Sequence, residues 1–125
     1  MSAQIFEEMD VWKRGCRQGV TVCRLIQDWR NFALRDQITR AAVSVRSNVA
    51  EGYERDSDGD FRRFLRIAKG SNAELRTQLY IASSLGLIDE TARKTLINES
   101  KEISAMLQGF IRAIERRSIP LNPET

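Results

Sequence analysis

The sequence predicts an all-α protein, an antiparallel four-helix bundle with up-down-up-down topology. In four long segments, apolar residues recur every three or four positions, the spacing that places them on one face of a helix. Short breaks rich in polar residues or glycine separate the segments, and no alternating strand pattern competes with them. Helices of roughly 20 to 28 residues joined by such short turns pack as antiparallel neighbours.

The first helix is expected from about Ile5 to Trp29. Gly15 and Gly19 lie one turn apart in it and would allow a neighbouring helix to approach closely, at some cost in helix stability. Its expected apolar stripe consists of Met9, Trp12, Cys16, Val20, Cys23 and Ile26.

The second helix, from Leu34 to Tyr53, combines an apolar face with residue types that are unfavourable inside helices. Serine, asparagine and glycine in a helix interior need a packing or functional reason. The apolar face consists of Leu34, Ile38, Ala41, Val45 and Val49, and the unfavourable or polar residues are Ser44, Ser47, Asn48, Glu51 and Gly52.

The third helix follows a polar break and ends at a glycine. Ser57 with Asp60 three residues later resembles a capping box, and Gly86 is well placed to stop the helix after Leu85. The expected inner face consists of Phe61, Phe64, Leu65, Ala68, Leu75, Leu79 and Ala82.

The fourth helix can be capped by Asp89, and Arg116 and Arg117 near its end complement the helix dipole. Because Pro120 and Pro123 end regular structure, we expect a single bundle domain over residues 1–118 and a flexible tail over 119–125. The expected inner face of the fourth helix consists of Ala92, Leu96, Ile103, Met106, Leu107, Phe110 and Ile114.

The turn at Ser57 also predicts which residues of the second and third helices face each other. Counting outward from it brings Gly70 and Ser71 opposite the segment from Ala42 to Val45. Small residues then meet small residues, so we expect these two helices to be the closest pair.

Composition places the chain among single-domain globular proteins. Its 125 residues are 42% hydrophobic and 30% charged. No apolar run approaches the ~20 residues of a membrane helix, and the N-terminus lacks the pattern of a signal peptide. We expect a cytoplasmic protein with no membrane partner. Cys16 and Cys23 would lie about 10 Å apart along a helix, too far for a disulfide, so both are interpreted as small buried residues.

The chain is basic, with 20 Lys and Arg against 17 Asp and Glu. Arg62, Arg66, Lys69 and Arg76 would form one stripe on the third helix, beside its apolar face. Such a stripe can follow the phosphates of a nucleic acid, largely without regard to sequence. A solvated face or salt bridges between subunits would give the same pattern. Arg40 and Arg46 on the second helix are further candidates for phosphate contact.

A set of polar residues is expected where the second and third helices meet, and it consists of Asn48, Glu51, Ser71, Glu74 and Gln78. Buried polar groups are costly unless paired, so we interpret the set as a hydrogen-bonded network that fixes register or subunit geometry. Two carboxylates could also do acid–base work or hold a metal. Bundles with two-metal sites supply Glu-x-x-His motifs, however, and the chain has no histidine. We therefore predict no catalytic residue, no metal and no cofactor.

Four aromatic residues could stack on bases if they were exposed near cations. Trp12 is expected in the core. Trp29 and Tyr53, near helix ends, are better candidates than Trp12 for a base platform or a subunit contact. Tyr80 is the fourth aromatic residue that could stack on a base.

The segment SVRSNVAEGYERDSDGDFRRFLRIAKGSNAELRTQLYIASSLGLID resembles the four-helix bundle proteins encoded in intervening sequences of bacterial 23S ribosomal RNA genes. That family has S-V-P-x-N-I-A-E-G, a short turn, and F-x-x-F-L-x-I-A-x-G-S-x-x-E-L-x-x-Q-L. Arg46 stands where the family usually has proline. The matching residues are Ser44, Val45, Asn48, Ala50, Glu51 and Gly52 in the first block, and Phe61, Phe64, Leu65, Ile67, Ala68, Gly70, Ser71, Glu74, Leu75, Gln78 and Leu79 in the second.

The resemblance implies a bundle that assembles as a ring, commonly a homopentamer, with binding of RNA or another nucleic acid as its proposed role. Related accessory proteins of diversity-generating retroelements are similar barrels that bind nucleic acid and a reverse transcriptase. No reaction is implied and no small-molecule substrate is evident. We therefore expect a non-enzymatic oligomeric protein that binds itself and RNA or DNA. The alternative is a protein-docking adaptor or scaffold whose cations serve only subunit pairing.

Overall fold

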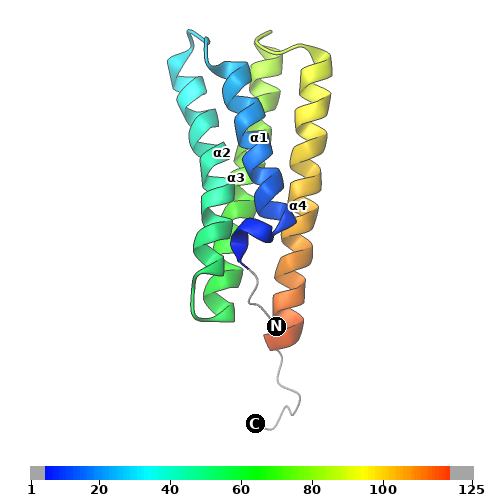
Figure 1. Cartoon of the computed structure of the whole chain (residues 1–125). Helices are drawn as coiled ribbons and strands as arrows, with labels where there is room; N and C mark the ends of the chain where they lie inside the picture. Colours follow the sequence, from blue (N-terminus) through cyan, green and yellow to red (C-terminus); the bar gives the residue numbers. More distant parts are fainter. Residues whose placement is uncertain (1–4, 119–125) are drawn as a thin grey trace.

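The computed structural model describes residues 5–118, which form four α-helices and one short 3-10 helix (Figure 1). The predicted tail, 119–125, lies outside the described residues. Within 5–118 no residue is in a strand, so the prediction of an all-α four-helix protein is confirmed. The elements are η1 (Phe6–Glu8), α1 (Asp10–Ile26), α2 (Phe32–Tyr53), α3 (Asp58–Ser84) and α4 (Glu90–Ser118).

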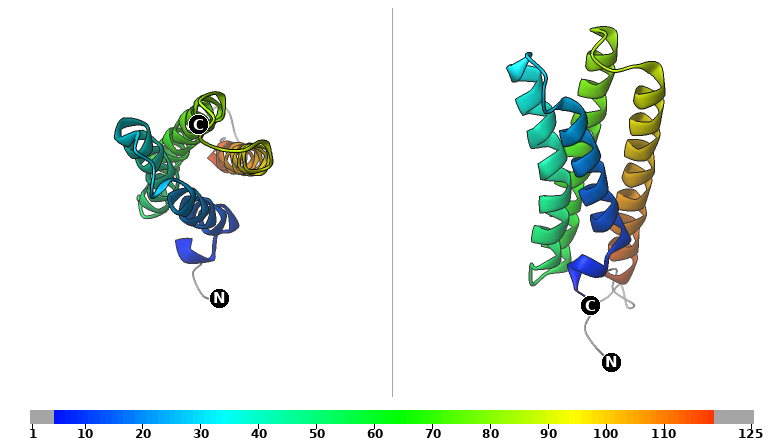
Figure 2. Two further views of the ribbon diagram at one scale, coloured as in Figure 1. Left: turned by 90° about the horizontal axis from the view of Figure 1, so that it is seen from above. Right: turned by 45° about the horizontal axis from the view of Figure 1, so that its top comes forward.

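The four long helices lie side by side, and their connecting turns alternate between the two ends of the molecule (Figure 1). Each helix packs against its neighbours in the order α1, α2, α3, α4, and α4 closes the circle against α1. The view from above in Figure 2 shows α3 between α2 and α4. Because α4 lies beside α3, residues on one side of α3 border α4.

The predicted caps are present at the turns. Ser57 accepts a hydrogen bond from the Asp60 amide at 3.1 Å, and Asp89 accepts one from the Ala92 amide at 2.7 Å. Gly86 has a φ of +74°, in the left-handed region that favours glycine, and so it ends the third helix as expected. Asn31 caps α2 in the same way by accepting from the Leu34 amide at 3.2 Å.

The first helix differs from the prediction in its extent. It starts at Asp10 and not at Ile5, because Met9 has an extended backbone that separates α1 from η1. This bend turns the Met9 side chain into the core and lets the ring of Phe6 pack edge-on against Trp12 at 5.3 Å. The helix ends at Ile26, three residues before the expected Trp29.

The buried face of α1 was predicted only in part, since Met9 and Ile26 are buried as expected but the other four residues of the stripe are not. Val20 is 50% exposed, and Trp12, Cys16 and Cys23 are half-buried. A Cβ atom added at Gly15 would lie 3.5 Å from Arg46 Cβ of α2, so the helices approach on the glycine side. Glycine adds nothing to an apolar pattern, which explains the error. The residues buried on α1 are Val11, Gly15, Gln18, Gly19, Val22 and Ile26.

The core consists of two apolar clusters with buried polar residues at the level between them. Asn72 of α3 donates to the Ser100 carbonyl of α4 at 2.7 Å, and Ser100 Oγ donates to Asn72 Oδ1 at 3.0 Å. The upper cluster consists of Val22, Ile26, Leu34, Ile38, Ala41, Ala42, Leu75, Leu79, Ala82, Ile88, Leu96 and Ile97. The lower cluster consists of Met9, Val11, Val45, Val49, Phe61, Leu65, Ala68, Ile103, Leu107, Ile111 and Ile114.

The most extensive contact in the bundle is that between α2 and α3. The hydroxyl oxygens of Ser44 and Ser71 are 2.7 Å apart, in the register expected from the Ser57 turn. Gly70, expected in this contact, is exposed instead. The close approach occurs at Gly52, where an added Cβ would lie 2.7 Å from Phe64 Cβ.

Candidate nucleic-acid interface

The four cations predicted as a stripe lie along the side of α3 that borders α4. Lys69 Nζ donates to Gln108 Oε1 at 2.7 Å, and Arg76 Nη1 donates to Ser100 Oγ at 3.4 Å. Arg66 Nη2 lies 3.5 Å from Glu115 Oε1. Arg62 makes no hydrogen bond or ion pair with any other described residue. The stripe therefore follows the boundary between the two helices.

α4 adds cations to the same side of the molecule. Lys101 lies seven residues before Gln108 and Arg112 lies four residues after it, so both share the Gln108 side of α4. Both side chains are exposed. Sequence reasoning missed them because the pattern of α4 does not show which of its sides adjoins α3. We call this surface the α3–α4 cationic face, defined by Arg62, Arg66, Lys69, Arg76, Lys101 and Arg112.

The acidic groups near this face leave most of its positive charge uncompensated. The Arg66–Glu115 pair is long, and both side chains are about half exposed, so it contributes at most about 1 kcal/mol. At the lower end, Asp58 accepts two hydrogen bonds from Arg117, at 2.8 and 3.1 Å, which raises the pKa of Arg117. This pair ties the end of α4 to the start of α3.

Two other carboxylates of α4 point away from this face, toward α1. Glu99 accepts from Arg14 Nε at 3.1 Å and from Arg14 Nη2 at 2.6 Å, and Glu102 accepts from the same guanidinium group. The hydrogen bonds that Arg14 donates to Glu99, and then to Glu102, raise the pKa of Arg14. Glu99 and Glu102 thus hold α1 in place, while Lys101 and Arg112 of α4 lie on the side of α3.

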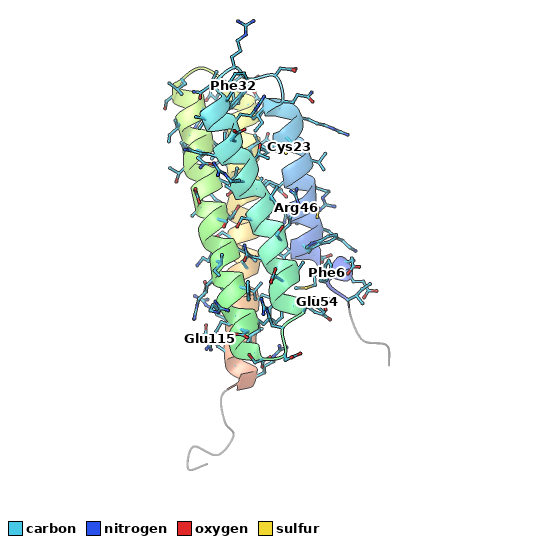
Figure 3. The ribbon with its side chains drawn as sticks, turned by 90° about the vertical axis from the view of Figure 1, so that its left-hand side faces the viewer. Phe6, Cys23, Phe32, Arg46, Glu54 and Glu115 are labelled. Carbon is cyan, nitrogen blue, oxygen red and sulfur yellow. The ribbon has the colours of Figure 1, made fainter. Side chains whose placement is uncertain are left out.

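The remaining two predicted phosphate contacts are not on this face. Arg40 is exposed on α2, in a groove of about 630 Å³ between α2 and α3. Arg46 lies on the side of α2 toward α1 (Figure 3). There its Nη1 atom is buried against Gly19 without a hydrogen-bond partner among the described residues. In the same contact, burial raises the pKa of the Cys16 thiol. The six predicted cations therefore occupy three different faces.

The five polar residues predicted as one network are divided into three groups. Asn48 Nδ2 donates to the Ser44 carbonyl and hydroxyl at 2.8 and 2.9 Å, and through Ser44 it is linked to Ser71. Gln78 Nε2 donates to Glu74 at 3.4 Å. Glu51 is exposed and instead pairs with Arg55 at 2.8 Å.

Sequence reasoning missed the buried polar residues between the core clusters, namely Gln18, Asn72 and Ser100. The signal that could have found Asn72 is its place on the apolar face of α3, between Ala68 and Leu75.

Of the aromatic candidates, Trp12, Trp29 and Tyr53 are all half-buried. Trp29 packs against the upper cluster, and the ring of Tyr53 lies edge-on to Phe61 at 5.9 Å. Tyr80 is exposed.

Across residues 5–118, no three His, Cys, Asp or Glu side chains gather in a group that could hold a metal ion. None of the helices in that range is both long enough and apolar enough to cross a membrane.

Comparison with known proteins agrees with the fold and the motifs. A crystal structure of a protein of unknown function from the S23 ribosomal protein family of Bacteroides thetaiotaomicron superposes with a TM-score of 0.77 at 24% identity. The match covers 81% of this chain and 97% of that one. No curated protein sequence matches the chain. The family model described as 23S rRNA-intervening sequence protein matches residues 7–109. Because that match spans most of the sequence, the chain belongs to the 23S rRNA-intervening sequence protein family.

Proposed function

We propose that the chain is a non-enzymatic, oligomeric binding protein that binds RNA or another nucleic acid through the α3–α4 cationic face. In this proposal the up-down-up-down bundle assembles as a ring-like homo-oligomer, with a homopentamer as the first expectation. The proposal includes a relation between this chain and the accessory proteins of diversity-generating retroelements, whose partners include nucleic acid. No catalytic step and no cofactor is part of the proposal.

The observation that carries this proposal is the uncompensated charge of the face. Its cations line the boundary between two neighbouring helices, and among the described residues Glu115 is the carboxylate within ion-pair distance of one of them. A phosphate backbone needs a track of this kind, in which each contact contributes little and releases bound counterions. Such contacts position a nucleic acid without reading its sequence.

Assembly would strengthen this weak site. A single subunit offers a few exposed contacts, but each further subunit in a ring adds the same face at a high effective concentration. Overall avidity can then exceed the affinity of one face by about 10² to 10⁴. This gain in avidity requires a ligand long enough to reach two subunits.

The test is a fluorescence anisotropy titration with labelled RNA and DNA across a range of salt concentrations. We expect affinity to fall steeply with salt, and Arg62→Glu/Arg66→Glu to weaken binding at least about tenfold with a smaller salt slope. The matched control is Arg17→Glu/Arg24→Glu, which makes the same change in charge at exposed positions of α1. Absence of binding by the unchanged protein at low salt, or equal loss in both variants, would overturn the proposal.

The second candidate function is a protein-docking adaptor, and a different surface favours it. Within residues 5–118, Phe32 and Leu85 are the two most exposed of the large apolar side chains, and both belong to the upper end of the bundle (Figure 3 labels Phe32). Exposed apolar residues that gather in one region often mark a protein contact. In the same titration the adaptor predicts no binding of nucleic acid, while Phe32→Ser and Leu85→Ser would abolish binding of a protein partner.

A further inference from the structure

A hollow of about 430 Å³ lies at the upper end of the α3–α4 cationic face. Tyr80 continues the cationic stripe, because Arg76 is four residues before it and the stripe advances in steps of three and four. Arg93 faces it from the first turns of α4. The lining consists of Tyr80, Ser83, Ser84, Ile88, Glu90 and Arg93.

Tyr80 is 42% exposed, more than any other tryptophan or tyrosine in the described residues. Among the described residues its ring makes no aromatic or cation–π contact, so a flat ligand could stack on it. Stacking of a base on an aromatic side chain contributes about 1 to 3 kcal/mol and tolerates any base, because every base has a π face. An aromatic ring at the end of a phosphate track is therefore suited to an unpaired nucleotide.

The polar groups of the hollow suit the edge and the phosphate of such a nucleotide. Arg93 is held only loosely, with Nη2 3.8 Å from Glu90 Oε1, so its guanidinium group can turn toward a phosphate or a ring. Lys94 also pairs with Glu90, at 3.2 Å, and the two cations offset the charge of this carboxylate. Glu90 can accept hydrogen bonds from the amino group of a base, as carboxylates do in other complexes.

We propose that this hollow binds one unpaired base of a single-stranded RNA or DNA whose phosphates follow the α3–α4 cationic face. The inference rests on the proposed function and names its ligand more narrowly. Tyr80 and Arg62 are 18 residues apart, about 27 Å along the helix. Paired bases are stacked inside a duplex and cannot present a face to Tyr80, so the site selects single strands.

The test compares a labelled single strand of about 20 nucleotides, longer than typical single-strand sites, with a duplex of the same sequence. We expect tighter binding of the single strand, and a roughly 5- to 150-fold loss of single-strand affinity in Tyr80→Ala. Tyr80→Phe keeps the ring and should retain that affinity. Phe32→Ala removes another exposed ring at the same end of the bundle and should have no effect. Duplex binding should be equal in all four proteins.

A strand of the same length without bases provides a second readout. It should bind the unchanged protein about as weakly as the normal strand binds Tyr80→Ala, and Tyr80→Ala should weaken it no further. Loss of binding in Arg62→Glu/Arg66→Glu but not in Tyr80→Ala would overturn the base site and leave the proposed function standing. Absence of all binding by the unchanged protein would overturn both. Far-UV circular dichroism confirms that each variant is folded.

Discussion

Gln18 has a buried side-chain amide without hydrogen-bond partners among the described residues. Its side chain is 2% exposed, and neither Nε2 nor Oε1 has a hydrogen-bond partner within the described part of the chain. An unpaired amide in a core costs the free energy of removing it from water, about 1 to 3 kcal/mol. Asn72, by contrast, is fully paired with Ser100. Burial of the amide therefore lowers the stability of the fold at Gln18, whereas at Asn72 hydrogen bonds to Ser100 compensate for it.

Replacing Gln18 by leucine should therefore stabilise the protein. Gln18→Leu removes the unpaired amide from the core, and we expect the free energy of unfolding to rise by about 1 to 3 kcal/mol in urea denaturation.

Asn72→Leu is the matched control, since it also places leucine at a buried polar position. It should destabilise the protein by a similar amount, because Ser100 loses its partner. If both variants were destabilised alike, Gln18 would have a stabilising role that its lack of hydrogen bonds does not suggest.

At the scale of helices, the contact between α2 and α3 depends on the absence of a side chain at Gly52. A Cβ atom there would lie 3.2 Å from the Phe61 carbonyl oxygen and 2.7 Å from Phe64 Cβ. The backbone oxygen cannot rotate away, so the helices would have to separate. The smallest residue sets how closely this pair packs, with the ring of Phe61 and the Cβ atom of Phe64 against it.

Gly52→Ala should consequently lower the free energy of unfolding by about 1 to 3 kcal/mol, the usual cost of overpacking. Gly109→Ala is the control within α4, where nothing lies within 4 Å of the added atom. There alanine improves helix propensity, and we expect a gain of up to about 1 kcal/mol. Thermal unfolding followed by circular dichroism measures both. A loss in Gly109→Ala as large as that in Gly52→Ala would contradict the packing explanation.

The sequence predicted some features of the helices because their signals are local. The caps at Ser57 and Asp89 and the stop at Gly86 depend on neighbouring residues, and all three are present. The spacing of the third helix was sufficient to place its cations on one side. The apolar stripe predicted for α1 was right only at its ends, because the buried face includes glycines, although the close approach of a neighbour at Gly15 and Gly19 was predicted.

The sites that the sequence did not predict depend on which helices are neighbours. Nothing local to Lys101 or Arg112 indicates that they flank the stripe on α3. Likewise, Tyr80 and Arg93 meet at one hollow only because the turn between α3 and α4 folds back at Gly86. A periodicity argument assigns a residue to a side of its own helix, and the packing of the bundle then decides what lies beside it.

At the scale of the whole molecule, the faces have different characters. Cations lie along α3 and α4, and the acids Glu99 and Glu102 are engaged by Arg14 of α1. The outer side of α3, beside this face, carries the exposed apolar residues Ile67 and Ile81, with Gly70, Glu74 and Thr77 between them. Contact between subunits through this side would cover apolar surface and leave the cations open to a ligand.

The last prediction tests this arrangement of subunits. Ile67 is 41% exposed, and placing a charge there should prevent burial of the outer side of α3 without disturbing the core. We expect light scattering to give a multiple of the 14.3 kDa subunit mass for the unchanged protein, and the single subunit mass for Ile67→Glu. Val20→Glu, at an exposed apolar position of α1, is the control and should leave the oligomer intact.

Affinity for RNA of different lengths then distinguishes the contribution of subunit assembly from that of a single α3–α4 cationic face. The single-subunit variant should lose affinity for a long RNA, which reaches several subunits, far more than for a short one, which occupies a single face. Equal loss for both lengths would mean that Ile67 contributes to the face directly. A mass of 14.3 kDa for the unchanged protein at every concentration would exclude the ring and leave one subunit to bind alone.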